Sequence, residues 1–85
     1  MENNIPAQPA NSARVILTLS APEKRMDNKL LETIRNQNEN MKLKNLSRAA
    51  LKKLFNDGKI QIKNQKAKTS SSLAKGTTYV DILGF

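Results

Sequence analysis

The sequence contains no cysteine and no histidine, and these absences exclude several classes of chemistry. Without cysteine the chain can form no disulfide and offers no thiolate, and without histidine it lacks the commonest metal ligand and general base. Acidic residues are also scarce, with seven Asp and Glu among 85 residues. They show no spacing typical of a catalytic carboxylate pair or a metal site, and no glycine-rich phosphate loop is present. We therefore expect neither an enzyme nor a protein that holds a metal or cofactor.

Aromatic and long apolar segments are rare as well. The chain has two Phe, one Tyr and no Trp, so it offers few platforms on which unpaired bases could stack. No apolar run approaches the roughly 20 residues that a membrane-spanning helix needs. The first residues lack the charged start and apolar stretch of a signal peptide. We expect a cytoplasmic protein with no membrane partner and no small-molecule substrate.

Positive charge is concentrated in the middle of the chain. Residues 41–75 hold ten basic side chains against the single acid Asp57, a net charge of +9. The remaining residues hold five basic and six acidic side chains, a net charge of −1. Such segregation favours a polyanionic partner, with nucleic acid first and an anionic membrane second. The alternative is a basic surface that serves only solubility.

Residues 46–68 carry the clearest local pattern. On a helical wheel that starts at Ser47, one side holds Ala50, Leu51, Leu54 and Phe55, and the other holds Arg48, Lys52, Lys53 and Asn56. This separation predicts an amphipathic helix with a cationic face, in which Leu54 and Phe55 belong to the core. Ser47 is a natural N-cap, and Leu46 can pack on Leu51 as a hydrophobic staple. Gly58 can end the helix in the left-handed conformation.

The rest of the chain divides into short elements. The pattern predicts strands near residues 14–20, 59–63, 66–68 and 77–83, and helices near 23–37 and 47–57. Ser20 and Glu23 match a capping box for the first helix. Residues 36–44 are predicted to be a polar connection and residues 69–75 a serine-rich loop. Residues 1–13 are expected to be disordered, which leaves one domain over residues 14–85.

Asp27 lies within the apolar stripe of the first predicted helix, which is unusual for a carboxylate. Met26, Leu30, Leu31 and Ile34 form that stripe. One hypothesis is that Asp27 orients a basic neighbour, such as Arg48. The other is that it is a negative charge favoured by the free N–H groups at the start of a helix.

Several short motifs, in this order and spacing, resemble the S-four RNA-binding domain, named after small-subunit ribosomal protein four. The motifs are Arg25-Met26-Asp27, Ser47-Arg48, Asp57-Gly58, Asn64-Gln65 and Gly76-Thr77. The strand before the first helix is most similar to the version found at the N-terminus of large-subunit pseudouridine synthases. Gln65 replaces the family's turn glycine and Thr77 replaces its aspartate. The resemblance covers about four-fifths of the chain.

The resemblance implies an α+β fold in which two helices pack on a small, twisted, mainly antiparallel sheet. It implies that the second helix and the hairpin form one basic surface that binds structured RNA, ribosomal or transfer, by backbone and shape. By resemblance, the RNA-binding residues are Arg25, Ser47, Arg48, Lys52, Lys53, Lys63, Lys66 and Lys68. We expect a monomer. Two alternatives stay open: a helix-turn-helix-like DNA-binding module that uses residues 47–57, and a basic protein-interaction domain.

Overall fold

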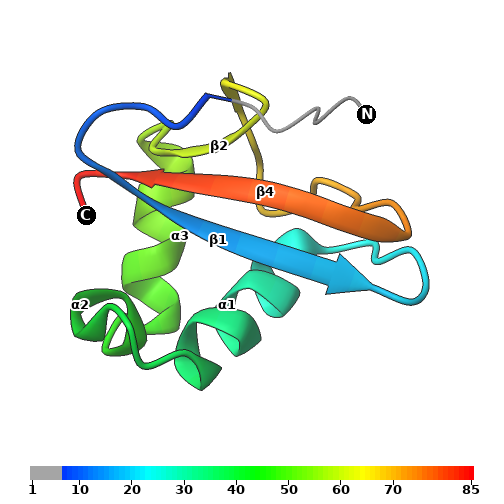
Figure 1. Cartoon of the computed structure of the whole chain (residues 1–85), viewed down its shortest axis with the longest axis horizontal. Coiled ribbons are helices and arrows are strands. Elements are labelled where there is room, and N and C mark those ends of the chain that lie inside the picture. Colours follow the sequence, from blue (N-terminus) through cyan, green and yellow to red (C-terminus); the bar gives the residue numbers. More distant parts are fainter. Residues whose placement is uncertain (1–6) are drawn as a thin grey trace.

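The computed structural model describes residues 7–85 and shows a small α+β domain. Its elements are β1 (Ser12–Leu19), α1 (Met26–Asn36), α2 (Met41–Lys44), α3 (Arg48–Asn56), β2 (Ile60–Ile62), β3 (Gln65–Lys66) and β4 (Gly76–Leu83) (Figure 1). The disorder expected for residues 1–13 falls partly on residues 1–6, which lie outside the described residues. β1 begins two residues earlier than the sequence pattern predicted.

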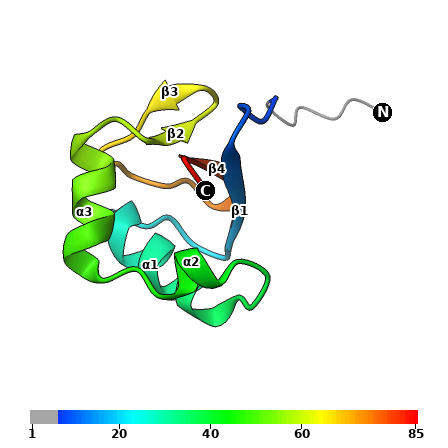
Figure 2. The same cartoon turned by 90° about the vertical axis from the view of Figure 1, so that its left-hand side faces the viewer.

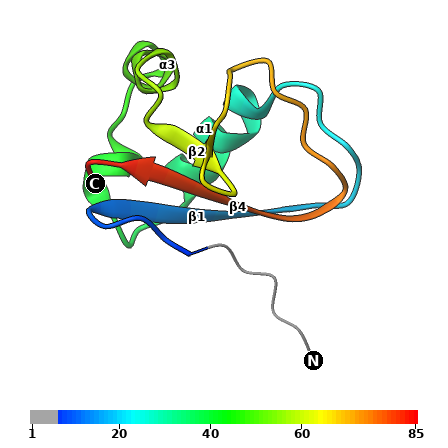
Figure 3. The same ribbon diagram turned by 90° about the horizontal axis from the view of Figure 1, so that it is seen from above.

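The four strands form one antiparallel sheet in the order β1-β4-β2-β3. β1 and β4 pair without interruption from Ser12 opposite Leu83 to Leu19 opposite Gly76. The helices lie on one side of this sheet (Figure 3). Because side chains alternate across a strand, Val15 and Leu17 of β1 and Val80 and Ile82 of β4 face the helices and are buried.

The core fills the space between that sheet face and the helices. The predicted stripe of α1 is confirmed: Met26, Leu30, Leu31 and Ile34 are all buried. From α3, Leu51 and Phe55 are buried, whereas Leu54 is only partly buried at the edge of the core. The expectation that Leu54 is a full core residue is therefore wrong. Its position on the wheel leaves it at the border between the buried and the wet side of the helix.

α1 begins at Met26, three residues later than the predicted helix start at residue 23. Glu23 is not in the helix: its N–H donates to the carbonyl of Leu73 at 2.9 Å, and the N–H of Leu73 donates back at 2.7 Å. The first N–H groups of α1 are satisfied by the serine-rich loop, because Met26 donates to the carbonyl of Ser71 at 3.1 Å. A long-range pairing has therefore replaced the local cap.

The connection predicted over residues 36–44 contains the short helix α2. The side chain of Asn40 caps it by accepting from the N–H of Leu43 at 3.2 Å. Gln37 fixes the preceding loop, since its side-chain oxygen accepts from the N–H groups of Glu39 and Asn40 at 2.9 and 2.8 Å. Leu43 packs into the core, with 2% of its surface exposed. The domain thus has three helices, where the resemblance implied two.

The predicted ends of α3 are confirmed. The hydroxyl of Ser47 accepts from the N–H of Ala50 at 3.0 Å. At the other end Gly58 has φ of 72°, and its N–H donates to the carbonyl of Phe55 at 3.1 Å. The N–H of Lys59 donates to the carbonyl of Leu54 at 2.9 Å. This pair of bonds is a Schellman motif, in which the left-handed residue is glycine because no side chain opposes that conformation.

The hairpin turn lies one residue earlier than predicted. Ile62 pairs with Gln65, so the two turn residues are Lys63 and Asn64, with φ of 53° and 63°. Positive φ at both positions is typical of a type I′ turn, which matches the twist of the flanking strands. Gln65 therefore belongs to β3, and Lys63 belongs to the turn rather than to a strand. The third strand, expected at residues 66–68, covers only Gln65–Lys66.

A buried ion pair on the other face of the sheet was not predicted. Arg14 of β1 donates from Nε and from a terminal nitrogen to the two carboxylate oxygens of Asp81 in β4, at 2.7 and 2.9 Å. Asp81 has no exposed surface. The hydrogen bond to Asp81 raises the pKa of Arg14 above its ordinary value. The guanidinium carbon also lies 5.5 Å from the ring centre of Tyr79, a cation–π arrangement.

The difference between Leu51 and Leu54 gives a test of the core. Leu51→Ala should lower the free energy of unfolding by about 2–5 kcal/mol, because it leaves a cavity between α1 and α3. Leu54→Ala removes the same atoms from a partly exposed site and should cost only about 1 kcal/mol. Urea titration of both variants measures the two losses. Equal losses would contradict the packing described here.

Candidate nucleic-acid interface

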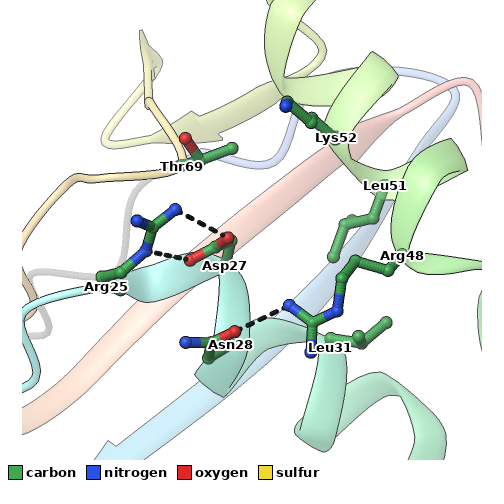
Figure 4. Close-up of a pocket in the computed structure, with 8 residues that line it drawn as sticks. All are labelled: Arg25, Asp27, Asn28, Leu31, Arg48, Leu51, Lys52 and Thr69. Atoms are coloured by element: carbon green, nitrogen blue, oxygen red, sulfur yellow. Dashed lines mark hydrogen bonds and ion pairs between the residues drawn. The ribbon is translucent and has the colours of Figure 1, made fainter.

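A cleft of about 400 Å³ separates the start of α1 from α3 (Figure 4). We call it the arginine cleft, and it is lined by Arg25, Asp27, Asn28, Leu31, Arg48, Leu51, Lys52 and Thr69. Leu31 and Leu51 form its apolar floor. Three basic side chains surround it: Arg25 at the start of α1, Arg48 at the start of α3 and Lys52 in the middle of α3. The cleft brings together three of the residues that the resemblance implied, Arg25, Arg48 and Lys52.

Arg25 is held in place by Asp27. Its Nε and one terminal nitrogen each donate to a carboxylate oxygen of Asp27 at 3.2 Å (Figure 4). These bonds lower the pKa of the Asp27 carboxyl, and the more distant positive charge of Arg48 lowers it slightly further. They also raise the pKa of Arg25. Asp27 thus orients a basic neighbour, but the neighbour is Arg25 and not Arg48.

Arg48 reaches across the cleft from α3 to α1. One of its terminal nitrogens donates to the side-chain oxygen of Asn28 at 2.7 Å (Figure 4). An arginine carries five N–H donors in a planar fork, so this single bond fixes the group and leaves other donors for a ligand. Asn28 was not identified from the sequence, because nothing in its local pattern shows that α3 packs against it.

Lys52 and Thr69 form the rim of the same cleft. Lys52 is exposed on α3, one turn after Arg48, and no ion pair joins it to another of the described residues. Thr69 comes from the loop between β3 and β4, on the opposite side (Figure 4). The rim therefore combines a lysine with a hydroxyl, and each of the two arginines of the cleft hydrogen-bonds to a side chain of α1.

A second cleft, of about 450 Å³, lies where α3 ends beside the hairpin. We call it the lysine cleft, because Lys66 and Lys68 line it together with Thr69 and Ser70. The aliphatic part of Lys66 lies over Gly58, where an added Cβ would be 2.8 Å from Cε of Lys66. Thr69 lines both clefts, so the two basic sites adjoin. Figure 2 shows the hairpin next to the end of α3.

Three of the predicted residues lie elsewhere. Lys63 lines a third cleft with Lys75 and Tyr79, away from the arginine cleft. Lys53 is exposed and pairs with Asp57 at 3.7 Å, a weak surface ion pair. The hydroxyl of Ser47 is occupied by its role as the cap of α3. The single basic surface that the resemblance implied is thus divided into separate clefts, of which the first two are contiguous.

Comparisons of the chain with protein-family models, with curated proteins and with solved structures found no match. Across residues 7–85, no cluster of three or more Asp, Glu, His or Cys side chains is placed to bind a metal ion. Nor does this part of the chain contain a helix that is long and apolar enough to cross a membrane. The candidate site therefore consists of arginines, lysines and hydroxyl groups around open clefts, with Asp27 lining the first cleft and Asp57 the second.

The lowered pKa of Asp27 makes the stability of the domain depend on pH. In the unfolded chain the carboxyl has its ordinary pKa of about 3.9 and binds a proton more readily than in the folded protein. The free energy of unfolding should therefore fall as pH drops below about 4 and Asp27 becomes protonated. Asp27→Asn should flatten this dependence, as measured by urea titrations between pH 6 and pH 2.5.

Glu32→Gln is the matched control, because Glu32 lies on the same helix and forms an exposed pair with Lys29. This variant should keep the acid dependence of the unmodified protein. A D27N curve that parallels the unmodified one would show that the pair with Arg25 makes no net contribution to stability.

Proposed function

We propose that this protein is an RNA-binding module of the S-four type, which binds structured RNA through phosphate groups along the arginine and lysine clefts. The observation that carries the proposal is the position of the two guanidinium groups. Arg25 and Arg48 face one cleft from different helices, each fixed by a neighbouring side chain. Guanidinium groups make forked hydrogen bonds to phosphate oxygens, so two fixed groups favour an anion with a defined geometry.

The surroundings of the clefts support a polyanion rather than a small anion. Lys52 lies on the rim of the arginine cleft, and Lys66 and Lys68 continue the positive charge into the lysine cleft. Several separate phosphates of one backbone can occupy such a series of sites. Residues 41–75 carry a net charge of +9, and no comparable excess is found elsewhere in the chain. Electrostatic attraction along this path would supply most of the affinity.

The side chains around the clefts favour recognition of shape over recognition of bases. No aromatic side chain lines the arginine cleft, and Phe55, which lines the lysine cleft, is only 5% exposed. Stacking of unpaired bases needs exposed aromatic rings. Folded RNA presents closely spaced phosphates in fixed positions, which lysines and arginines can contact without base readout. Ribosomal or transfer RNA is therefore the class of ligand that we propose.

The order of elements also supports the proposal. A strand is followed by helices, a short basic hairpin and a long final strand, which is the order that the resemblance implies. The short helix α2 is an addition to that plan. Every group of both clefts comes from one chain, so a monomer can bind RNA. On this proposal the protein has no catalytic role, needs no cofactor and acts in the cytoplasm.

Arg48→Ala combined with Lys52→Ala tests the proposal. If about five phosphates are neutralised, the slope of log affinity against log salt should be roughly −3.5 to −4.5. The double variant should weaken binding to different structured RNAs alike and reduce that slope by about 2. Fluorescence anisotropy across a salt series measures both quantities, and NMR spectra establish that the fold is intact.

Lys42→Ala combined with Lys44→Ala is the matched control, because it removes the same charge from α2, outside both clefts. It should change affinity much less. Equal losses in the two double variants would refute the clefts as the site. Tighter binding to duplex DNA or to an acidic protein than to structured RNA, in competition at moderate salt, would favour one of the other two classes.

A further inference from the structure

The two edges of the sheet differ in how they are protected. At one edge, β3 has only two residues and carries lysines within and beside it. Short edge strands and lysines are common devices against pairing with another chain. At the other edge, β1 has eight residues, no proline and no bulge, since its register with β4 is continuous. Its only charged side chain, Arg14, is neutralised by Asp81.

The hydrogen-bond pattern shows which residues of β1 face outward. The N–H of Gly84 donates to the carbonyl of Asn11 at 2.7 Å, in register with the β1–β4 ladder. Bonded and non-bonded pairs alternate in antiparallel strands, so residues 13, 15, 17 and 19 bond to β4. The main-chain groups of Arg14, Ile16 and Thr18 therefore point away from the sheet. Among residues 7–85, none of these groups has another hydrogen-bond partner.

The outer edge of β1 pairs with no other strand of the described residues, and the segment 37–40 flanks its first half. Among residues 7–85, no helix or strand lies beyond β1 in Figure 3. A groove of about 290 Å³ runs along residues 13–16, and Gln37, Glu39 and Asn40 lie on its far wall. Ile16 is 54% exposed, and it is one of two large apolar residues exposed in the described part of the chain. An unprotected edge with an exposed isoleucine at its centre is suited to strand addition.

We infer that β1 pairs with β1 of a second copy of this chain, antiparallel and centred on Ile16. In this register Ile16 lies opposite Ile16 of the other copy, and Arg14 lies opposite Thr18. Each of the three outward residues would then donate and accept one main-chain hydrogen bond. Directly opposite side chains fall on the same face, so the two exposed isoleucines contact each other, and no like charges meet. The pairing is isologous and therefore closes as a dimer.

Electrostatic repulsion between copies favours pairing through β1 over pairing through the edge that carries the hairpin. Each chain carries a net charge of +8, and two such chains repel each other. The order β1-β4-β2-β3 places the basic hairpin at the opposite edge, so pairing through β1 keeps the two hairpins far apart. The inference departs from the monomer that the sequence predicted, because sequence pattern does not show which strand is at an edge. It does not depend on RNA binding.

Pairing of one strand buries less surface than a standard interface, so the dimer should be weak, with a Kd of about 10 μM to 1 mM. Sedimentation equilibrium should show the mass rising from 9.5 kDa toward twice that value over this range. Added salt should strengthen the dimer by screening repulsion, whereas it weakens phosphate contacts. Amide exchange at Arg14, Ile16 and Thr18 should slow as concentration rises, whereas exchange at residues 13, 15 and 17 should not change.

Ile16→Lys should abolish the dimer, because it places two lysines opposite each other across the paired strand edges. Its side chain is already exposed, so the fold should survive. Met41→Lys is the matched control, since Met41 is 55% exposed on α2 and does not line the groove beside β1, and this variant should still dimerise. A constant mass of 9.5 kDa up to about 1 mM would overturn the inference. So would an I16K protein that dimerises as well as M41K.

Discussion

The fold depends on β4, because β4 joins the long strand β1 to the β2–β3 hairpin in one sheet. It bonds to β1 on one side and to β2 on the other, and its buried residues Val80 and Ile82 lie under the helices. β4 is also the last element of the described residues, far from β1 in the sequence. The sheet therefore cannot form until the first and last strands meet, and such long-range pairing is slow compared with helix formation. The position of β2 on β4 in turn holds the hairpin beside the end of α3.

Sequence patterns predicted the element boundaries that depend on neighbouring residues. They failed where a boundary or contact depends on segments far apart in the sequence. Ser47 and Gly58 were correctly identified as the ends of α3, because each cap uses main-chain groups within four residues of it. The start of α1 was wrong, because a pairing with Leu73 holds Glu23 in an extended conformation. The Arg14–Asp81 pair joins residues 67 apart, and no local pattern indicates that they are opposite each other.

The same distinction applies to the candidate site. The surplus of positive charge in residues 41–75 was evident in the sequence, and the resemblance implied that Arg48, Lys52, Lys66 and Lys68 within it bind RNA. Their grouping was not predictable, because it depends on how α1, α3 and the hairpin pack. The turn placed Lys63 in a different cleft, and the pairs Arg25–Asp27 and Arg48–Asn28 fix two guanidinium groups that composition shows only as charge. Preorganised groups lose less entropy when a ligand binds, so these two pairs define the centre of the proposed site.

The most direct test of the RNA-binding proposal is an NMR titration of the protein with a structured RNA, in which backbone amides and arginine side-chain Nε–H signals are followed. The proposal predicts that Arg25 and Arg48 Nε–H signals shift together, with backbone changes at Lys52, Thr69 and the hairpin. It predicts no change along β1 at a protein concentration low enough to keep the chain monomeric. Shifts confined to the outer face of the sheet, or arginine signals that stay constant while the RNA binds, would contradict the account.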